Sequence, residues 1–270
     1  MISSYLNNIS AQLKNYSATI DKTNILADKP WVLIDENSEI QKLIFKRNNE
    51  LILSKNGNVR IGSWEYFPQA KSILIDRGEG KILCNEGYID DAVMILKLDG
   101  SKNNFYLFAN ENLIPNLDAL TYLKKIRAAK LNILERKMSD GRILEIHRQP
   151  LDLGPEQCGN SITINAENIP DGLYELSNHQ KYILSEKSSI KEIYFKKHYI
   201  NTKGAELIIF QKLDIQNRIG FGDILVVNGI TIDNGIYEFS NKKNLIIKNG
   251  KIIRLEWKNK FLRILADVFS

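Results

Sequence analysis

The second half of the chain contains the same short pattern of residues twice. Two glycines, a Tyr-Glu pair and a Ser-Asn pair recur at a constant separation of 63 residues. A duplicated unit of about 60 residues usually reflects architecture and surface display rather than a single catalytic centre. A unit this small is marginal alone, so we expect the copies to pack together or on the rest of the chain. The matched pairs are Leu144/Leu207, Ile146/Ile209, Gly159/Gly222, Asn165/Asn228, Gly172/Gly235, Tyr174/Tyr237, Glu175/Glu238, Ser177/Ser240 and Asn178/Asn241.

Residues 31–112 have the alternation and the turn dipeptides of antiparallel β-structure. Asn56-Gly57 and Asp99-Gly100 favour tight hairpins, because both turn positions tolerate positive φ. Up to eight strands in about 80 residues predict a barrel or a strongly bent sheet. The expected strands are Trp31–Ile34, Gln41–Lys46, Leu51–Ser54, Val59–Phe67, Ser72–Asp76, Lys81–Cys84, Val93–Leu98 and Asn104–Ala109.

A helix is predicted over residues 1–27, because apolar residues recur there on one helical face. This face either packs on its own domain, pairs with a second copy or another protein, or lies on a membrane surface. The membrane alternative is the weakest, because Lys14 and Lys22 are its only cations. The residues of the stripe are Ile2, Leu6, Ile9, Leu13, Tyr16 and Ile20.

A second helix is predicted over residues 113–131, with Asn116 as its N-cap and Leu117, Leu120, Leu123 and Ile126 as its buried stripe. It closes the first domain.

The fold class predicted from these elements is mainly β (α+β). An antiparallel barrel-like domain with an N-terminal helix and a closing helix precedes two tandem small β-modules. The expected parts are an N-terminal amphipathic helix at 1–28, a β domain with its C-terminal helix at 29–131, and β-modules at 132–206 and 207–270.

The first β region carries a resemblance to a known class of domain. Trp31 is followed by the apolar strands Leu43-Ile44-Phe45 and Leu51-Ile52-Leu53, then by Gly57 and by Gly62-Ser63-Trp64. This order resembles the small lipocalin-like β-barrel domains found in many bacterial proteins of unknown role, although Asn48-Asn49 replaces their usual glycine turn. The resemblance covers about 80 residues and implies a barrel whose apolar interior is able to hold a small ligand. Such fold-level analogy does not carry function by itself.

The repeats carry a second resemblance. Each copy has an Asp/Asn-Gly-x-Tyr strand, and Asn249-Gly250 makes a later turn in the second copy, where the first copy has Glu186-Lys187. This shape resembles short β-modules attached to some phage head-maturation proteins. The resemblance implies no catalytic residues.

The sequence contains no recognisable catalytic or metal-binding motif. None of His147, His179 and His198 has a second histidine or a cysteine at ligand spacing, and no phosphate loop or nucleophile elbow is present. Cys84 and Cys158 lie outside any paired-cysteine motif, so we expect buried, inert thiols. We therefore predict no catalytic residues, no metal and no cofactor, while an enzyme with an unfamiliar site stays open.

Three aromatic residues are candidates for binding a small apolar ligand in the barrel: Trp31, Trp64 and Tyr66. The alternative is that they fill the core, because small barrels are usually packed with side chains.

Positive charge is concentrated near the C-terminus. Residues 242–263 hold eight cations and one acid, for a net charge of +7 in a chain of net +5. This window is either a solvated face that protects edge strands, a docking face for an anionic partner or surface, or a nucleic-acid site. The candidate binding residues are Lys248, Lys251, Arg254, Lys258 and Lys260.

The duplication and the missing catalytic motifs together favour a non-enzymatic interaction or assembly module. Its partner is unknown, and self-association through residues 2–20 is one form of it. The alternatives are a small apolar ligand in the barrel, or an anionic partner or nucleic acid on the basic C-terminal repeat. No secretory signal is visible and no apolar run approaches the length of a membrane span, so a cytoplasmic location is expected.

Overall fold

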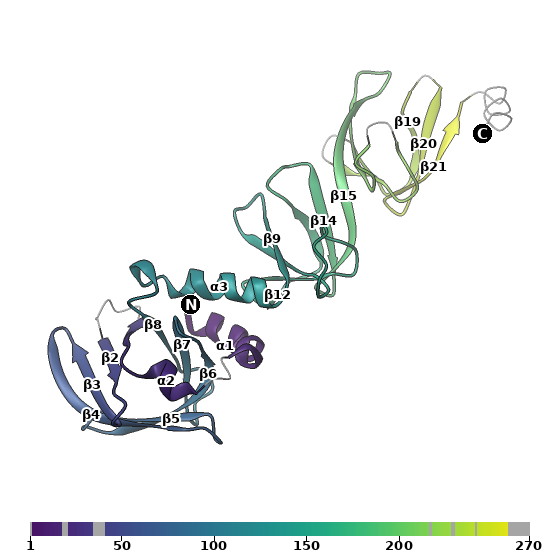
Figure 1. The fold of residues 1–270 in the computed structure, drawn as a ribbon. Helices are drawn as coiled ribbons and strands as arrows, with labels where there is room; N and C mark the ends of the chain where they lie inside the picture. The colour runs from purple at the N-terminus through teal and green to yellow at the C-terminus, as the bar shows by residue number, and fades with distance from the viewer. Residues whose placement is uncertain are drawn as a thin grey trace. The chain divides into compact units, whose positions relative to one another are not determined.

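The computed structural model describes residues 2–17, 21–34, 41–215, 218–227, 230–240 and 242–258 (Figure 1). The chain forms two compact units, residues 1–133 with 165–167 and residues 134–164 with 168–270. The mainly β fold class is confirmed, with an N-terminal helix, a closed antiparallel barrel in unit 1 and further sheets in unit 2.

A closed barrel of eight antiparallel strands forms the body of unit 1. Each strand pairs with the next along the chain, and β8 returns to pair with β1. Along the strands every second side chain faces the interior, and because most of these are apolar, closing the sheet buries them. All eight predicted strands are present. Their bounds are β1 (Pro30–Ile34), β2 (Gln41–Phe45), β3 (Glu50–Lys55), β4 (Asn58–Phe67), β5 (Ser72–Asp76), β6 (Lys81–Ile89), β7 (Val93–Leu98) and β8 (Phe105–Asn110).

Strand β6 continues well beyond its predicted end at Cys84. A β-bulge in this continuation exchanges the inward-facing and outward-facing positions, so simple alternation does not predict it. The pairing with β7 shifts between Glu86 and Tyr88, which leaves Gly87 as the extra residue. A Cβ on Gly87 would lie only 3.1 Å from the Ile95 side chain, so a larger residue would press the two strands apart. Glu86 faces the interior, like Cys84 two residues before it, and the bulge turns Tyr88 outward, toward the helices.

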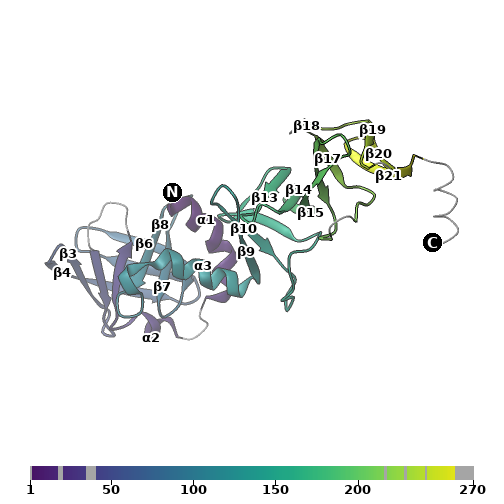
Figure 2. The ribbon, with the colours of Figure 1, turned by 90° about the horizontal axis from the view of Figure 1, so that it is seen from above.

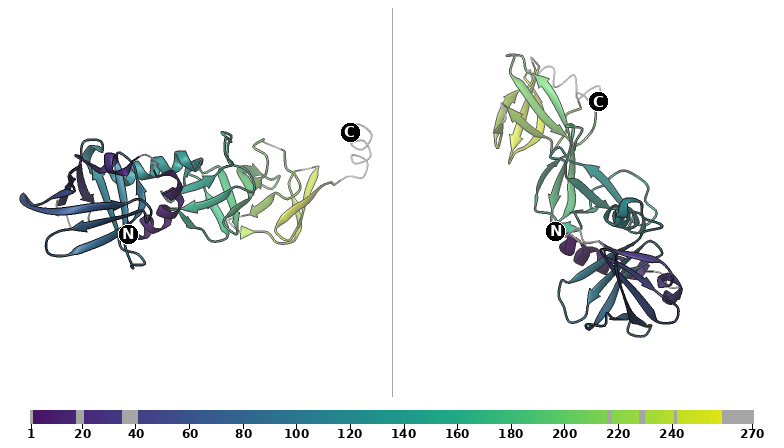
Figure 3. Two further views of the ribbon diagram at one scale, coloured as in Figure 1. Left: turned by 60° about the horizontal axis from the view of Figure 1, so that its bottom comes forward. Right: turned by 90° about the vertical axis from the view of Figure 1, so that its left-hand side faces the viewer.

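Two helices cover the outer face of β6 to β8 (Figures 2 and 3). On α1 (Ile2–Leu13), Leu6, Ile9 and Leu13 are buried against the barrel, and α3 (Ala119–Lys130) buries Leu123 there. Packing within unit 1, the first of the three alternatives, therefore accounts for these members of the N-terminal stripe. Strand β7 has a continuous apolar run because both of its faces are buried.

Two helix predictions are corrected by the structure. The helix predicted over residues 1–27 is divided into α1, the short 3₁₀ helix η1 (Lys14–Tyr16) and α2 (Lys22–Leu26). The N-cap predicted at Asn116 is wrong. Asn116 has a φ of 53° within η2 (Pro115–Leu117), and the Asp118 carboxylate instead accepts a hydrogen bond from the Thr121 N–H at 3.1 Å.

The short helix α2 closes one end of the barrel. Ile25 and Leu26 are buried in the interior core, and the Trp31 indole N–H donates to the Leu26 carbonyl at 3.0 Å. Phe45 and Trp64 pack edge to face beside them, with ring centroids 5.0 Å apart. This end of the interior is therefore filled with side chains.

A buried ion pair lies at the same end. The Lys22 amine is 2.8 Å from the Glu86 carboxylate, and both side chains are almost fully buried. The hydroxyls of Ser17 and Tyr66 also donate to Glu86. Buried charges persist only when they are paired and hydrogen-bonded, and these four side chains meet that condition.

Unit 2 consists of β-strands that form a ten-stranded sheet and a three-stranded sheet. The long strand β15 pairs with β14 up to Phe195 and with β16 from Phe195 onward, so it joins two sets of strands (Figure 1). The strands are β9 (Ile133–Lys137), β10 (Ile143–His147), β11 (Ser161–Ile164), β12 (Glu167–Asn168), β13 (Gly172–Glu175), β14 (Lys181–Glu186), β15 (Ser189–Ile200), β16 (Glu206–Gln211), β17 (Ile224–Val227), β18 (Ile230–Thr231), β19 (Gly235–Glu238), β20 (Lys243–Lys248) and β21 (Lys251–Trp257).

The two sets of strands pair in the same register. Ile146 opposes Ile162, and Ile209 opposes Leu225, at the separation of 63 residues seen in the sequence. The β14–β15 and β20–β21 pairs both carry a register shift, after Leu184 and after Ile246, 62 residues apart. The separation changes because the β19–β20 hairpin is one residue shorter than the β13–β14 hairpin.

The turn between β14 and β15 differs from its prediction. The turn residues are Lys187 and Ser188, with φ of 52° and 53°, rather than Glu186-Lys187. Their counterparts are Asn249 and Gly250, which also have positive φ. The backbone conformation is thus alike in both copies, although only the second has the Asn-Gly pair that favours it.

Candidate functional site

The end of the barrel opposite α2 has polar residues at its inward-facing positions. In a strand, residues two apart face the same side of the sheet. On β2, β3 and β4, and just after β5, the next inward-facing position toward this end is polar. Leu53, for example, faces the interior, Arg60 lies opposite it on β4, and Lys55 lies two residues further toward this end. We call this end the barrel mouth. Its inward-facing polar residues are Gln41, Lys55, Arg60 and Arg77.

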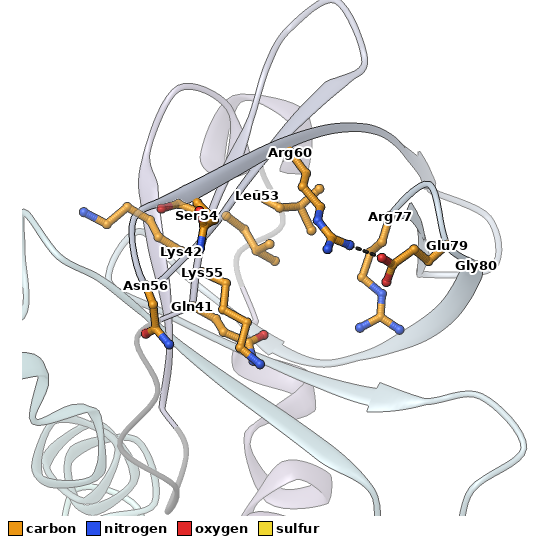
Figure 4. Close-up of a pocket in the computed structure, with 12 residues that line it drawn as sticks. Gln41, Lys42, Leu53, Ser54, Lys55, Asn56, Arg60, Arg77, Glu79 and Gly80 are labelled. Atoms are coloured by element: carbon orange, nitrogen blue, oxygen red, sulfur yellow. Dashed lines mark hydrogen bonds and ion pairs between the residues drawn. The ribbon is translucent and has the colours of Figure 1, made fainter.

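A cavity of about 600 Å³ lies at the barrel mouth (Figure 4). Of the described residues that line it, four are cations and one is a carboxylate. Figure 4 shows Lys55 approaching from one side and Arg60 and Arg77 from the other, with Arg60 joined to Glu79. The lining residues are Gln41, Lys42, Leu43, Leu53, Ser54, Lys55, Asn56, Asn58, Arg60, Arg77, Glu79 and Gly80.

A smaller apolar cavity of about 50 Å³ lies in the interior next to the mouth. The two cavities share four lining residues, Gln41, Leu43, Leu53 and Arg77, so they adjoin one another there. We call the smaller cavity the apolar recess. Its lining residues are Leu33, Gln41, Leu43, Leu53, Ile75, Arg77, Ile82, Leu96, Tyr106 and Phe108.

The cations at the mouth differ in their partners. Lys42 forms an ion pair with Glu111 at 2.5 Å, and Arg60 forms one with Glu79. Both members of the Arg60–Glu79 pair are well exposed, and such pairs contribute at most about 1 kcal/mol. Among the described residues, Arg77 forms no ion pair.

The charge of Arg77 acts on the barrel interior. Cys84 is fully buried there, and burial raises the pKa of its thiol to about 11, while the Arg77 guanidinium opposes that rise. The expectation of a buried, inert thiol fits Cys84, but Cys158 is exposed, because it lies in the loop between β10 and β11.

The three aromatic candidates lie deeper than the mouth. Trp31 and Trp64 belong to the packed interior core, and the Trp64 indole N–H donates to the Lys46 carbonyl at 2.9 Å. Tyr66 donates to Glu86 at 3.2 Å, and burial together with the charge of Glu86 raises its pKa to about 12. None of the three lines the mouth or the apolar recess.

The residues at the mouth were not among the sequence candidates. Gln41, Arg60 and Arg77 are hydrophilic residues at strand ends, which is where solvated side chains are expected. The signal that identifies them is phase: each lies an even number of residues from an interior position of its own strand. These positions can be recognised as inward-facing only when the sheet is known to close into a barrel.

The structure places carboxylates beside most of the basic C-terminal candidates. Lys251 pairs with Glu192 at 3.0 Å, and Arg254 pairs with Glu256 at 3.1 Å. Lys258 pairs with Glu238 at 2.6 Å, and hydrogen bonds from Lys258 and Thr202 lower the pKa of Glu238 to about 2. Lys248 is exposed, and Lys260 lies outside the described residues.

The histidines lie apart from one another, with different neighbours. His147 is 2.9 Å from the Thr163 hydroxyl, His179 is 3.2 Å from Glu175 and His198 is 2.8 Å from Glu206. In the part of the chain that the structure describes, no three His, Cys, Asp or Glu side chains gather as a metal site would require.

Two loops at equivalent positions in unit 2 expose apolar side chains. Leu151 and Leu153, in the β10–β11 loop, are 96% and 86% exposed. Leu213 and Ile215, in the β16–β17 loop, are 49% and 48% exposed. Each pair flanks an aspartate, so the tips Leu-Asp-Leu and Leu-Asp-Ile are a further similarity between the two copies. We call them the loop tips.

Comparisons with known proteins gave no match to any protein-family model, curated protein or solved structure. The closed eight-stranded barrel is compatible with the lipocalin-like fold. The resemblance to phage head-maturation modules stays a prediction. Of the helices in the described ranges, none has the length and hydropathy needed to cross a membrane.

Proposed function

We propose that unit 1 binds a small, largely apolar molecule at the barrel mouth. The observation that carries this proposal is the asymmetry of the interior: α2 fills one end, while the other opens through a cavity of about 600 Å³ into an apolar recess. Ligand pockets typically combine such an apolar wall with a few polar groups that fix orientation. This is the alternative function expected from the sequence, at a different set of residues, and the lipocalin-like resemblance agrees with it.

The size of the cavity supports the proposal. A volume of about 600 Å³ falls within the usual range for small-molecule pockets. The apolar recess alone is too small for a whole ligand, so the recess would take one apolar end and the mouth the remainder. Leu53 lines both cavities and therefore stands where the two parts of the ligand would meet.

The proposal is tested by filling the recess. The neutral dye N-phenyl-1-naphthylamine is titrated into the full chain, and its fluorescence reports transfer to an apolar site. Leu53→Trp should weaken dye binding by about tenfold, because the larger side chain occupies the recess. The control is Leu83→Trp, which adds the same ring on the outer face of β6, where Leu83 is 37% exposed.

Thermal melts of both variants show whether the barrel still folds, since an overpacked core costs about 1–3 kcal/mol. Equal dye binding by the wild type and a folded Leu53→Trp variant would place the dye elsewhere and reject the proposal.

A second candidate function, the interaction or assembly module favoured by the sequence, has its own observation. The loop tips expose four large apolar side chains on loops that correspond in the two copies, and exposed apolar groups are typical of interaction surfaces. Self-association is the form that can be tested directly. Sedimentation velocity of the wild type is compared with that of a variant carrying serine at Leu151, Leu153, Leu213 and Ile215. Concentration-dependent association that the variant loses would support this function, and a monomer at all concentrations would reject self-association.

A further inference from the structure

Among the described lining residues, the barrel mouth has more cationic than anionic side chains. Two of these cations have carboxylate partners, because Lys42 pairs with Glu111 and Arg60 pairs with Glu79. Concave surfaces lined by charges of one sign focus the field and favour ligands of opposite charge. An anionic ligand at this position would therefore lie close to these cationic side chains.

Arg77 has the position of a ligand-binding group. It lines both the mouth and the apolar recess, so its guanidinium lies at the boundary between a polar and an apolar environment. It forms no ion pair with any described residue. A guanidinium offers five N–H donors in a planar fork, which suits the paired oxygens of a carboxylate or a phosphate.

We infer that the molecule bound at the barrel mouth is an amphiphile with one anionic group, which Arg77 binds while the apolar part enters the recess. This inference rests on the proposed function and adds the chemical class of the ligand. The anion is a carboxylate or a phosphate, since both match the guanidinium.

The arrangement disfavours the other classes of ligand. A cationic head group would be placed beside Arg77 and repelled by it. A neutral molecule would gain the apolar contacts but leave Arg77 without a partner. The exposed Arg60–Glu79 pair is weak enough to rearrange at little cost when an anion enters.

The test compares ligands that differ only in their head group. Octanoate, octyl phosphate, octanol and octylamine are titrated into the full chain by isothermal titration calorimetry at low salt. We expect the better of the two anions to bind about tenfold more tightly than octanol, and octylamine to bind most weakly. Comparing octanoate with octyl phosphate identifies which anion the site prefers.

Variants at Arg77 locate the anion. Arg77→Gln should weaken binding of the anion about five- to tenfold and leave octanol within about twofold, because only the charged contact is lost. Arg77→Lys should retain most of the preference. The matched control, Arg47→Gln, removes an exposed arginine that pairs with Asp28 and lies outside both cavities, and should change nothing.

The outcomes separate the inference from the proposed function. If none of the four compounds binds, the proposed function fails. If octanol and both anions bind equally and Arg77→Gln leaves all three unchanged, the ligand site stands and the inference is rejected. Tighter binding of octylamine than of octanoate would also reject the inference, as would an anion preference that survives Arg77→Gln.

Discussion

Removing one member of the buried ion pair at the closed end of the barrel should cost far more stability than removing an exposed pair. The Lys22 amine and the Glu86 carboxylate are 2.8 Å apart, and their side chains are only 9% and 5% exposed. At an effective dielectric constant of 20, Coulomb's law gives an attraction of ~6 kcal/mol at this distance. Most of this attraction offsets the cost of removing both charges from water. The quantity to measure is therefore the loss of unfolding free energy when one buried charge is left without its partner, about 3–5 kcal/mol.

Lys22→Met retains the apolar stem and removes the charge. The Ser17 and Tyr66 hydroxyls still donate to Glu86, so we expect the lower end of that range, about 3 kcal/mol. The assay is urea unfolding at neutral pH followed by tryptophan fluorescence, since Trp31 and Trp64 both lie in the barrel core.

Two further variants complete the test. Lys46→Met is the matched control, because Lys46 pairs with Asp28 where both side chains are about two-fifths exposed. It should cost less than about 1 kcal/mol. In the Lys22→Met/Glu86→Gln double variant, the two losses should be less than additive, because the second change removes the charge that the first left unpaired. If Lys22→Met costs no more than Lys46→Met, the pair is not desolvated and the account of the closed end is wrong.

Two other predictions concern ionisable groups. Burial alone would raise the pKa of Glu192, but hydrogen bonds from Lys212, Tyr194 and Lys251 lower it to about 2. This stabilisation is present above pH of about 4.5 and is lost as the pH falls toward 2. Glu192→Gln should therefore remove on the order of 1 kcal/mol of the acid-dependent change in unfolding free energy. An unchanged dependence of the unfolding free energy on pH would contradict this. For the thiols, a disulfide reagent should titrate Cys158 rapidly in the native protein and reach Cys84 only after denaturation, because Cys84 is buried and its pKa is raised. Equal native rates would show that the barrel interior is open to the reagent.

The barrel strands were predictable because each carries its own alternation and ends at a recognisable turn. Asn56 and Gly57, for example, have φ of 49° and 84°, as their hairpin requires. The extension of β6 was not predictable, since the bulge at Gly87 reverses the alternation on which the strand prediction rests. Closure of the sheet depends on the pairing of β1 with β8, which no local pattern specifies.

The division of the N-terminal helix reflects tertiary contacts. The Ser17 hydroxyl donates to Glu86 and accepts from the Ile89 N–H at 3.0 Å, so the chain is held against β6 where the stripe alone predicts further helix. The N-cap was misplaced for a different reason. Asn116 and Asp118 are both good caps, and only the backbone conformation distinguishes them.

The proposed site lies in the barrel, where the sequence placed its small-ligand alternative, but at residues other than the aromatic candidates. The sequence indicated a barrel interior for a small ligand, and its aromatic residues were the natural choice because they dominate most binding pockets. Trp31 and Trp64 instead fill the packed end, since their size and satisfied N–H groups suit the core. Arg77 has no distinguishing motif in the sequence, and only its place beside the apolar recess makes it a candidate.

The most direct test of the account is a crystal structure of the full chain grown with octanoate. We predict that the ligand lies at the barrel mouth, with its carboxylate within hydrogen-bonding distance of Arg77 and its alkyl chain against Leu53 and Phe108 in the recess. Octanoate bound elsewhere, with the mouth filled by its own side chains, would contradict the claim that this end of the barrel is a ligand site.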